Sequence, residues 1–168
     1  SSPSIENFSF MSTIDFPSTQ SAWISTGCGQ LETMTSNFAA RFRGRIQTQL
    51  AGEYTFFLTS DDGSILFIDA EEIITMNQAQ NVSTSQATVT LSAGYHDIEV
   101  DYFNKTENAE LNLQWVTPGE TTEVTVPASR LFHTVVSEYC EYFTVPRIFN
   151  FAVLFELENG ETVKINLS

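Results

Sequence analysis

The chain has 168 residues, of which 21 are Asp or Glu and 7 are Lys or Arg, giving a formal charge of −14 at pH 7. This length suits one domain with a substantial core. So acidic a surface repels phosphate groups, which argues against nucleic acid and anionic lipid as partners. No run of eighteen apolar residues is present, so no membrane insertion is predicted.

Residues 1–36 have little periodicity, but beyond them apolar and polar residues alternate along most of the chain. A period of two places alternate side chains on opposite faces of a β-strand. The anchors expected in the first 36 residues are Phe8, Phe10, Phe16 and Trp23. Strands are predicted over residues 38–43, 54–59, 65–69, 89–91, 97–103 and 111–115. Short strands separated by polar turns predict an all-β fold, an antiparallel β-sandwich.

The alternation changes character after residue 132. Residues 148–157 and 162–167, on either side of Asn159-Gly160, predict one more hairpin. We therefore assign residues 1–133 to one β-sandwich and residues 134–168 to a C-terminal extension. The extension either adds strands to the same domain or begins a following domain.

Two cysteines, Cys28 and Cys140, lie far apart in the sequence. A disulfide between them would close a loop of more than about 100 residues and stabilise the fold by roughly 4–5 kcal/mol. The alternative is two unrelated buried thiols. Sequons, the acceptor motifs for N-glycosylation, begin at Asn7, Asn81, Asn104 and Asn166. Cysteines and sequons together predict an extracellular or cell-surface protein.

The adjacent carboxylates Asp61 and Asp62 are the most informative residues of the chain. The strand over residues 54–59 runs into them, and the strand over residues 65–69 is expected to lead straight back out. At an effective dielectric constant of about 20, two negative charges about 4 Å apart repel by roughly 4 kcal/mol. Solvent or a cation must offset that repulsion, and carboxylate oxygens suit calcium. The alternative is a tight turn that favours Asp-Asp-Gly for its backbone.

The sequence offers no catalytic constellation, so we expect a protein that is not an enzyme. The histidines His96 and His133 lack the spacing to Cys or acidic residues that a zinc site needs. No Gly-x-Ser-x-Gly motif is present. Adjacent carboxylates are also wrong for glycoside hydrolysis, in which two acids flank the scissile bond from opposite sides.

Three further acids and a tryptophan have simpler explanations. Asp97, Glu99 and Asp101 alternate along one strand, so we expect them to form a solvated face. Asp69 is expected to be a turn or edge residue, and Trp115 a core residue.

Several motifs follow one another along the chain in a specific order. They are Phe38-Ala-Ala-Arg-Phe-Arg-Gly44, Gly52-Glu-Tyr-Thr-Phe56, Ser60-Asp-Asp-Gly-Ser-Ile-Leu-Phe-Ile-Asp69, Leu91-Ser-Ala-Gly-Tyr-His-Asp-Ile-Glu-Val-Asp-Tyr102, Ala109-Glu-Leu-Asn-Leu-Gln-Trp115 and Val126-Pro-Ala-Ser-Arg-Leu-Phe132. Over residues 5–133 the order resembles the PA-fourteen (PA14) family, named from anthrax protective antigen. Its members include the sugar-binding heads of yeast flocculins, epithelial adhesins and some bacterial surface adhesins. The resemblance implies the same β-sandwich.

In the lectin-like members of that family, a cis peptide joins two aspartates that both ligate calcium. Carried onto this chain, the resemblance implies a ligand set of the Asp61, Asp62 and Asn104 side chains and the Thr106 and Asn108 carbonyls. The sugar would contact Asp61, Asp62 and Asn104, because its hydroxyls enter the calcium shell. Gln78 and Gln80 are either further hydroxyl partners or part of an ordinary loop. The sequon at Asn104 would then be coincidental or unused.

The sequence thus predicts a calcium-dependent carbohydrate-binding module of an extracellular adhesin, a monomeric domain within a larger multidomain protein. Its partner would be a cell-surface glycan or polysaccharide. One alternative is a structural or protein-interaction sandwich that binds no sugar. Another is an accessory binding domain of a carbohydrate-active enzyme.

Overall fold

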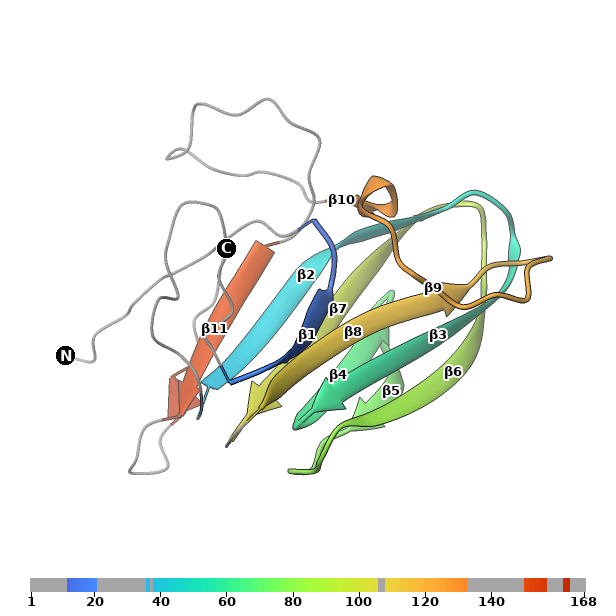
Figure 1. Cartoon of the computed structure of the whole chain (residues 1–168). Helices are drawn as coiled ribbons and strands as arrows, with labels where there is room; N and C mark the ends of the chain where they lie inside the picture. Colours follow the sequence, from blue (N-terminus) through green and yellow to red (C-terminus); the bar gives the residue numbers. More distant parts are fainter. Residues whose placement is uncertain are drawn as a thin grey trace.

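The computed structural model of the protein describes residues 12–20, 36, 38–105, 108–132, 150–156 and 162–163. Within these ranges the fold is an antiparallel β-sandwich with one short 3-10 helix, η1 (Ala128–Arg130), as Figure 1 shows. The strands are β1 (Asp15–Thr19), β2 (Phe38–Thr48), β3 (Gly52–Asp61), β4 (Gly63–Ile68), β5 (Glu71–Met76), β6 (Ser83–Leu91), β7 (Gly94–Asn104), β8 (Ala109–Val116), β9 (Val124–Thr125), β10 (Leu131–Phe132), β11 (Asn150–Glu156) and β12 (Thr162–Val163).

Two sheets form the layers of the sandwich. The five-stranded sheet has the order β1-β8-β3-β6, with β9 beside β8. The seven-stranded sheet has the order β12-β11-β2-β7-β4-β5, with β10 beside β2. In Figure 1 the strands β8, β3 and β6 lie in front, and β2, β7, β4 and β5 lie behind them. The predicted all-β, antiparallel sandwich is confirmed. In the part of the chain that the structure describes, no helix has the length and apolar character needed to cross a bilayer.

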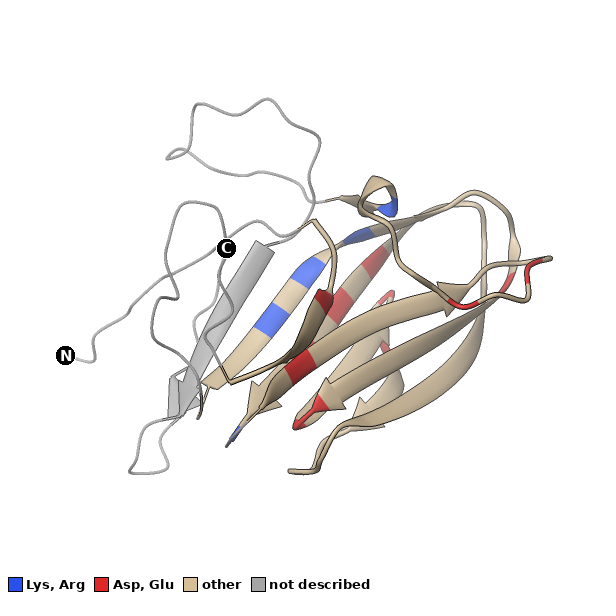
Figure 2. Ribbon diagram, viewed as in Figure 1, with Lys and Arg blue, Asp and Glu red and all other residues tan. Residues whose placement is uncertain are grey.

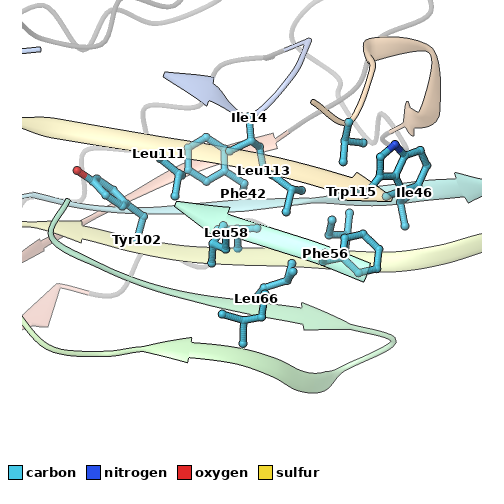
Figure 3. Packing of buried hydrophobic residues seen from close by; sticks show 14 of the residues in the cluster. Ile14, Phe42, Ile46, Phe56, Leu58, Leu66, Tyr102, Leu111, Leu113 and Trp115 are labelled. Carbon is cyan, nitrogen blue, oxygen red and sulfur yellow. The ribbon is translucent and has the colours of Figure 1, made fainter. Parts of the chain in front are cut away.

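The core lies between the two sheets and consists of the inward residues of the alternating pattern (Figure 3). In β3, Tyr54, Phe56 and Leu58 are buried, whereas the residues between them are only half-buried. Trp115 of β8 packs between the rings of Tyr54 and Phe56, with centroid distances of 5.5 and 6.2 Å. Each such buried side chain contributes about 1.5–3 kcal/mol relative to its exposed form. The expected core positions of Phe16 and Trp115 are confirmed.

The described part of the C-terminal region adds to the seven-stranded sheet. Strand β11 pairs antiparallel with β2, with Phe151 opposite Phe42, and β12 pairs with β11. The predicted C-terminal hairpin is therefore present in the described residues. Other predicted features lie outside those residues: Asn7, Phe8, Phe10, Trp23, Cys28, His133, Cys140 and Asn166.

The strand–turn–strand arrangement predicted around Asp61 and Asp62 is not a hairpin. Strand β3 pairs with β6 and β8, whereas β4 pairs with β5 and β7 in the other sheet. The chain therefore crosses from one sheet to the other at the acid pair. Alternation specifies which side chains face inward, but it does not specify which strands pair, so the sequence pattern was compatible with either arrangement.

The acids of β7 do not form the purely solvated face that was predicted. Arg41 makes a two-pronged contact with Asp101, with N···O distances of 2.5 and 2.6 Å. Arg43 Nε lies 2.5 Å from Glu99, and Arg45 Nε lies 3.2 Å from Asp97. Arginines and acids alternate at the same spacing, and the antiparallel register places them opposite one another (Figure 2). We call this row the ion-pair ladder.

The ladder predicts a difference between its two ends. The Arg41 and Asp101 side chains are only 20% and 25% exposed, whereas Arg45 and Asp97 are 55% and 73% exposed. The hydrogen bond to Asp101 raises the pKa of Arg41. We expect Arg41→Leu to lower the free energy of unfolding by about 1–2 kcal/mol, because it strands a partly buried carboxylate.

The control is Arg45→Leu, for which we expect a change below about 0.5 kcal/mol because solvent screens an exposed pair. Urea unfolding followed by circular dichroism measures both variants. If both variants lost the same free energy of unfolding, the contribution of each ion pair would not depend on its burial.

Candidate metal and ligand site

The acid pair lies at the edge of the sandwich where β3 passes into β4. The peptide bond between Asp61 and Asp62 is cis. Asp62 is 6% exposed and Asp61 is half-buried. A carboxylate so nearly buried must be held by hydrogen bonds or by opposite charge, because burying it otherwise is costly.

The Asp62 carboxylate ties together two loops. Its Oδ1 accepts a hydrogen bond from the backbone N–H of Gln80, at 3.0 Å, in the loop between β5 and β6. Its Oδ2 accepts one from the backbone N–H of Lys105, at 2.7 Å, between β7 and β8. Each carboxylate oxygen has about two acceptor positions, so both oxygens can accept a further ligand.

The backbone carbonyls of the acid pair are also held. The Tyr102 hydroxyl donates to the Asp61 carbonyl, and the Ser60 hydroxyl donates to the Asp62 carbonyl at 2.9 Å. Ser64 in turn donates to the Ser60 hydroxyl at 2.8 Å. Burial, and then the charges of Asp61 and Asp62, raise the pKa of Tyr102, so it remains a neutral donor. These bonds fix the backbone from which the two carboxylates project.

Gly63 is required by the space around it. A Cβ at this position would lie 2.2 Å from the Phe103 ring and 2.6 Å from the Met76 carbonyl oxygen. Contacts of that length do not occur, so a side chain here would displace β7 or the end of β5. The glycine therefore lets these strands close tightly beside the acid pair.

The structure brings most of the predicted ligands to this rim. Asn104 ends β7, is 1% exposed and immediately precedes Lys105, which bonds to Asp62. Asn108 is half-buried, just before β8, whereas Thr106 lies outside the described residues. Asn104 is nearly buried, which agrees with the prediction that its sequon is coincidental or unused. Asn81, in the neighbouring loop, is exposed.

The two candidate glutamines differ. Gln80 is half-buried, and its side-chain Nε2 is buried with no hydrogen-bond partner among the described residues. Such a donor normally has a partner, so Nε2 is a candidate for binding a ligand or water. Gln78 is exposed in the same loop.

The described side chains at this rim offer oxygen donors, the carboxylates of Asp61 and Asp62 and the amide of Asn104. Such hard donors suit calcium, which takes six to eight oxygen ligands. Among the described residues, no three His, Cys, Asp or Glu side chains form a metal-binding group. The chemistry of the rim therefore fits calcium better than zinc.

Sequence reasoning missed the residues that support the acid pair. Tyr102 appeared only as a residue of the predicted strand 97–103, although a buried tyrosine hydroxyl needs a partner. Ser60 and Ser64 flank the acid pair in the motif Ser-Asp-Asp-Gly-Ser, which was the available signal. The backbone N–H groups of Gln80 and Lys105 carry no sequence signal, because every residue except proline has one.

Asp69, His96 and Ser92 form a second polar cluster, on the seven-stranded sheet. His96 Nδ1 lies 2.6 Å from Asp69 Oδ2, and His96 Nε2 lies 3.0 Å from the Ser92 carbonyl oxygen. Asp69 has a φ of 51°, and its Oδ1 accepts from the Asp97 N–H, which confirms it as a turn residue. With Nε2 donating to a carbonyl, the ring cannot serve as a base for the Ser92 hydroxyl, so this is no catalytic triad.

The PA14 domain family model matches residues 9–128. The anti-sigma-I factor RsgI3 of Acetivibrio thermocellus is 26% identical over 96 residues, which are 56% of this chain and 15% of that protein. The structure of an anti-sigma factor domain-containing protein from Clostridium clariflavum is also 26% identical, with a TM-score of 0.64 over 80% of this chain and 48% of that chain. The chain thus spans about half, or less, of the length of these relatives.

Two sugar-related structures share the fold. The PA14 sugar-binding domain from an RTX adhesin is 20% identical, with a TM-score of 0.60 over 73% of this chain and 76% of that chain. The Epithelial Adhesin 9 A domain from Candida glabrata, in complex with Galβ1-3GlcNAc, is 16% identical, with a TM-score of 0.51 over 61% of this chain and 56% of that chain.

The two backbone hydrogen bonds to the Asp62 carboxylate predict a structural role for this residue that does not need metal. In Asp62→Asn, an amide group must face one of the two N–H donors, so one hydrogen bond is lost. In the presence of chelator, we expect the free energy of unfolding to fall by about 1–3 kcal/mol. The amide hydrogens of Gln80 and Lys105 should also exchange faster.

Asp15→Asn, at an exposed position of β1, is the matched control and should change neither quantity. Chemical unfolding and hydrogen exchange followed by NMR provide the readouts. If the amide hydrogens of Gln80 and Lys105 exchanged at the same rate in Asp62→Asn as in the parent, the two hydrogen bonds to Asp62 would be contradicted.

The His96 contacts predict a pH dependence. Burial alone would lower the pKa of His96, but the hydrogen bonds to Asp69 and Ser92 and the charges of Asp69 and Asp97 outweigh it and raise the pKa. The stabilisation is therefore complete below the ordinary histidine pKa of about 6.5 and is lost as the pH rises through the higher folded-state pKa.

We expect His96→Gln to be less stable than the parent by about 1–2 kcal/mol at pH 5.5, with a smaller difference at pH 9. Thermal unfolding of both proteins across this range measures that difference. If the difference in stability between the parent and His96→Gln grew as the pH rose, the raised pKa of His96 would be contradicted.

Proposed function

The chain belongs to the PA14 domain family, and on that premise we propose that it is a calcium-dependent carbohydrate-binding module. The observation that carries the proposal is the pair of adjacent acids at the rim, with the Asp62 carboxylate held by backbone N–H groups of two loops. The segments that carry the proposed ligands lie close together, because the Lys105 N–H after β7 bonds to Asp62 and Asp61 pairs with Glu110 of β8. The proposed calcium site requires this proximity.

The proposed calcium ligands are the Asp61 and Asp62 carboxylates, the Asn104 side-chain oxygen and the Thr106 and Asn108 carbonyls. A calcium ion bound there would offer coordination positions to two neighbouring sugar hydroxyls. The Asp61 and Asp62 oxygens would accept the protons of the same hydroxyls. Gln80 Nε2, buried without a partner among the described residues, would donate to a sugar oxygen. Gln78, exposed in the same loop, would contact the sugar further out.

The proposed function is binding rather than catalysis. The two acids are adjacent in the chain, so they cannot flank a glycosidic bond from opposite sides as hydrolysis requires. Contacts at an open rim are few, so one site would bind a sugar weakly. Strong attachment would then come from several copies acting together.

We propose an extracellular or cell-surface setting, as a module of a larger adhesin. The 26% sequence identity to anti-sigma-I factor RsgI3 over 96 residues favours a second setting, in which the same module is part of a signalling protein. Sugar binding would then be the signal that the protein detects, rather than a means of attachment. Both settings use the same rim, so a test of sugar binding applies to both.

The direct test is calcium titration followed by a glycan array with and without chelator. At a calcium concentration about 100 times the Kd, we expect stabilisation of about 2.7 kcal/mol and sugar binding that chelator abolishes. Asp61→Asn should lose both effects, because one of two charged ligands is removed, while Asp15→Asn should keep them.

Circular dichroism of Asp61→Asn checks that the fold is retained. Two results would overturn the proposal. One is a melting temperature that calcium does not change. The other is no chelator-sensitive sugar on the array when the protein is loaded with calcium.

A further inference from the structure

The outward side of the five-stranded sheet has a composition unlike that of the ion-pair ladder. Inward residues of β3, β6 and β8 pack in the core, so the residues between them face away from it. These are Thr55, Phe57 and Thr59 of β3, Thr84, Gln86 and Thr88 of β6, and Asn112 and Gln114 of β8. We call this set the outer face; Figure 1 shows its strands in front.

The outer face carries no positive charge. None of the strands β1, β3, β6, β8 and β9 contains Lys or Arg. Four acids on these strands flank the outer face: Glu53, Asp61 and Glu110 toward the ends of β3 and β8, and Asp15 of β1 opposite Asn112. In Figure 2 the strands β8, β3 and β6 are largely tan. Such a face repels anions and presents neutral hydrogen-bonding groups between the acids.

The hydroxyl groups of the outer face occur in cross-strand pairs. Thr55 Oγ1 lies 2.8 Å from Thr88 Oγ1, and Thr59 Oγ1 lies 2.7 Å from Thr84 Oγ1. Each pair has two hydroxyl hydrogens but needs only one for its mutual bond, so one donor and several acceptor lone pairs remain. The pairs thus offer ordered donors and acceptors at fixed spacing along the sheet.

Phe57 lies between these pairs in the middle strand. In the sheet register it is opposite Gln86 of β6 on one side and Gln114 of β8 on the other. The residue is half-buried although it points away from the core. An aromatic ring flanked by amides presents an apolar surface with polar groups at its edges, which is the composition of small-molecule sites.

A hollow of about 380 Å³ opens at one end of the outer face. Its lining comprises Glu53, Thr55, Thr88, Val116 and residues 117–120. The loop 117–120 closes against Gly52, where a Cβ would lie only 3.0 Å from Pro118. This volume is within the usual range of ligand pockets, about 300–1,000 Å³.

We propose that the outer face, with this hollow, is a second carbohydrate-binding surface, for a neutral polysaccharide chain. The Phe57 ring would stack on the apolar face of one sugar, and the threonine and glutamine groups would bond to hydroxyls. Glu53 and Glu120 at the hollow accept hydroxyl protons but repel carboxylated sugars. From Glu53 to Thr59 the strand extends about 20 Å, so the ligand is a chain rather than one sugar.

This surface is distinct from the acid pair. The hollow lies at the beginning of β3, whereas Asp61 and Asp62 lie at its end. Nothing in the outer face requires a metal. The inference therefore goes beyond the calcium-dependent site, and the two sites can be tested separately.

The test is affinity electrophoresis of the whole chain in gels containing hydroxyethyl cellulose, glucomannan or arabinoxylan, with chelator present. We expect retardation by at least one of these neutral polymers and none by polygalacturonate. Phe57→Ala should weaken binding at least tenfold, and Phe57→Tyr should restore it. The double variant Thr55→Val/Thr88→Val, nearly isosteric, should also weaken it.

The matched control is Phe67→Ala, a half-buried outward aromatic of β4 on the other sheet, which should bind as the parent does. Asp62→Asn should also bind normally here, although it disturbs the calcium-dependent site. Circular dichroism of each variant establishes that it folds.

Three results would overturn the inference. The first is no retardation by any neutral polymer in chelator. The second is equal binding by the parent and Phe57→Ala. The third is a concentration-dependent dimer, in sedimentation experiments, that Phe57→Ala dissociates, because the outer face would then be an interface between copies. If the first result occurred together with retardation in calcium, the calcium-dependent site would be supported and the outer face would be excluded as a binding surface.

Discussion

Asp62 organises the rim of this sandwich because it is only 6% exposed and its carboxylate is held from two sides. Two backbone N–H groups, from Gln80 and Lys105, bond to its two oxygens and so draw the β5–β6 and β7–β8 loops together. Removing those bonds would leave a nearly buried carboxylate without hydrogen-bond partners, which is a costly defect in a protein interior. The geometry of the proposed ligand site therefore depends on the same interaction that closes the sandwich at this end.

The outward surfaces of the two sheets differ in their charged residues. On the seven-stranded sheet, three arginines balance three acids, and the partly buried Arg41–Asp101 pair lies at one end of the row. On the five-stranded sheet, threonine and amide groups surround Phe57 without a basic residue. Ion pairs stabilise the first surface, whereas the middle of the second presents neutral side chains between flanking acids.

Much of the fold could be predicted because burial leaves a periodic trace. Tyr54, Phe56 and Leu58 alternate with half-buried residues, and they occupy the core as expected. The acid pair could also be found, since Asp61 and Asp62 are adjacent and follow a strand. The partners of Asp62 could not, because backbone N–H groups from loops distant in sequence carry no residue-specific signal.

The amino-acid sequence by itself determined the sandwich, its inward residues and the position of the acid pair, because these depend on local alternation and on neighbouring residues. Only the tertiary structure decided that β3 and β4 belong to different sheets, and that Arg41 faces Asp101. Strand pairing and register join residues far apart in the chain, and several registers satisfy the same alternation. Packing of the whole core selects one of them.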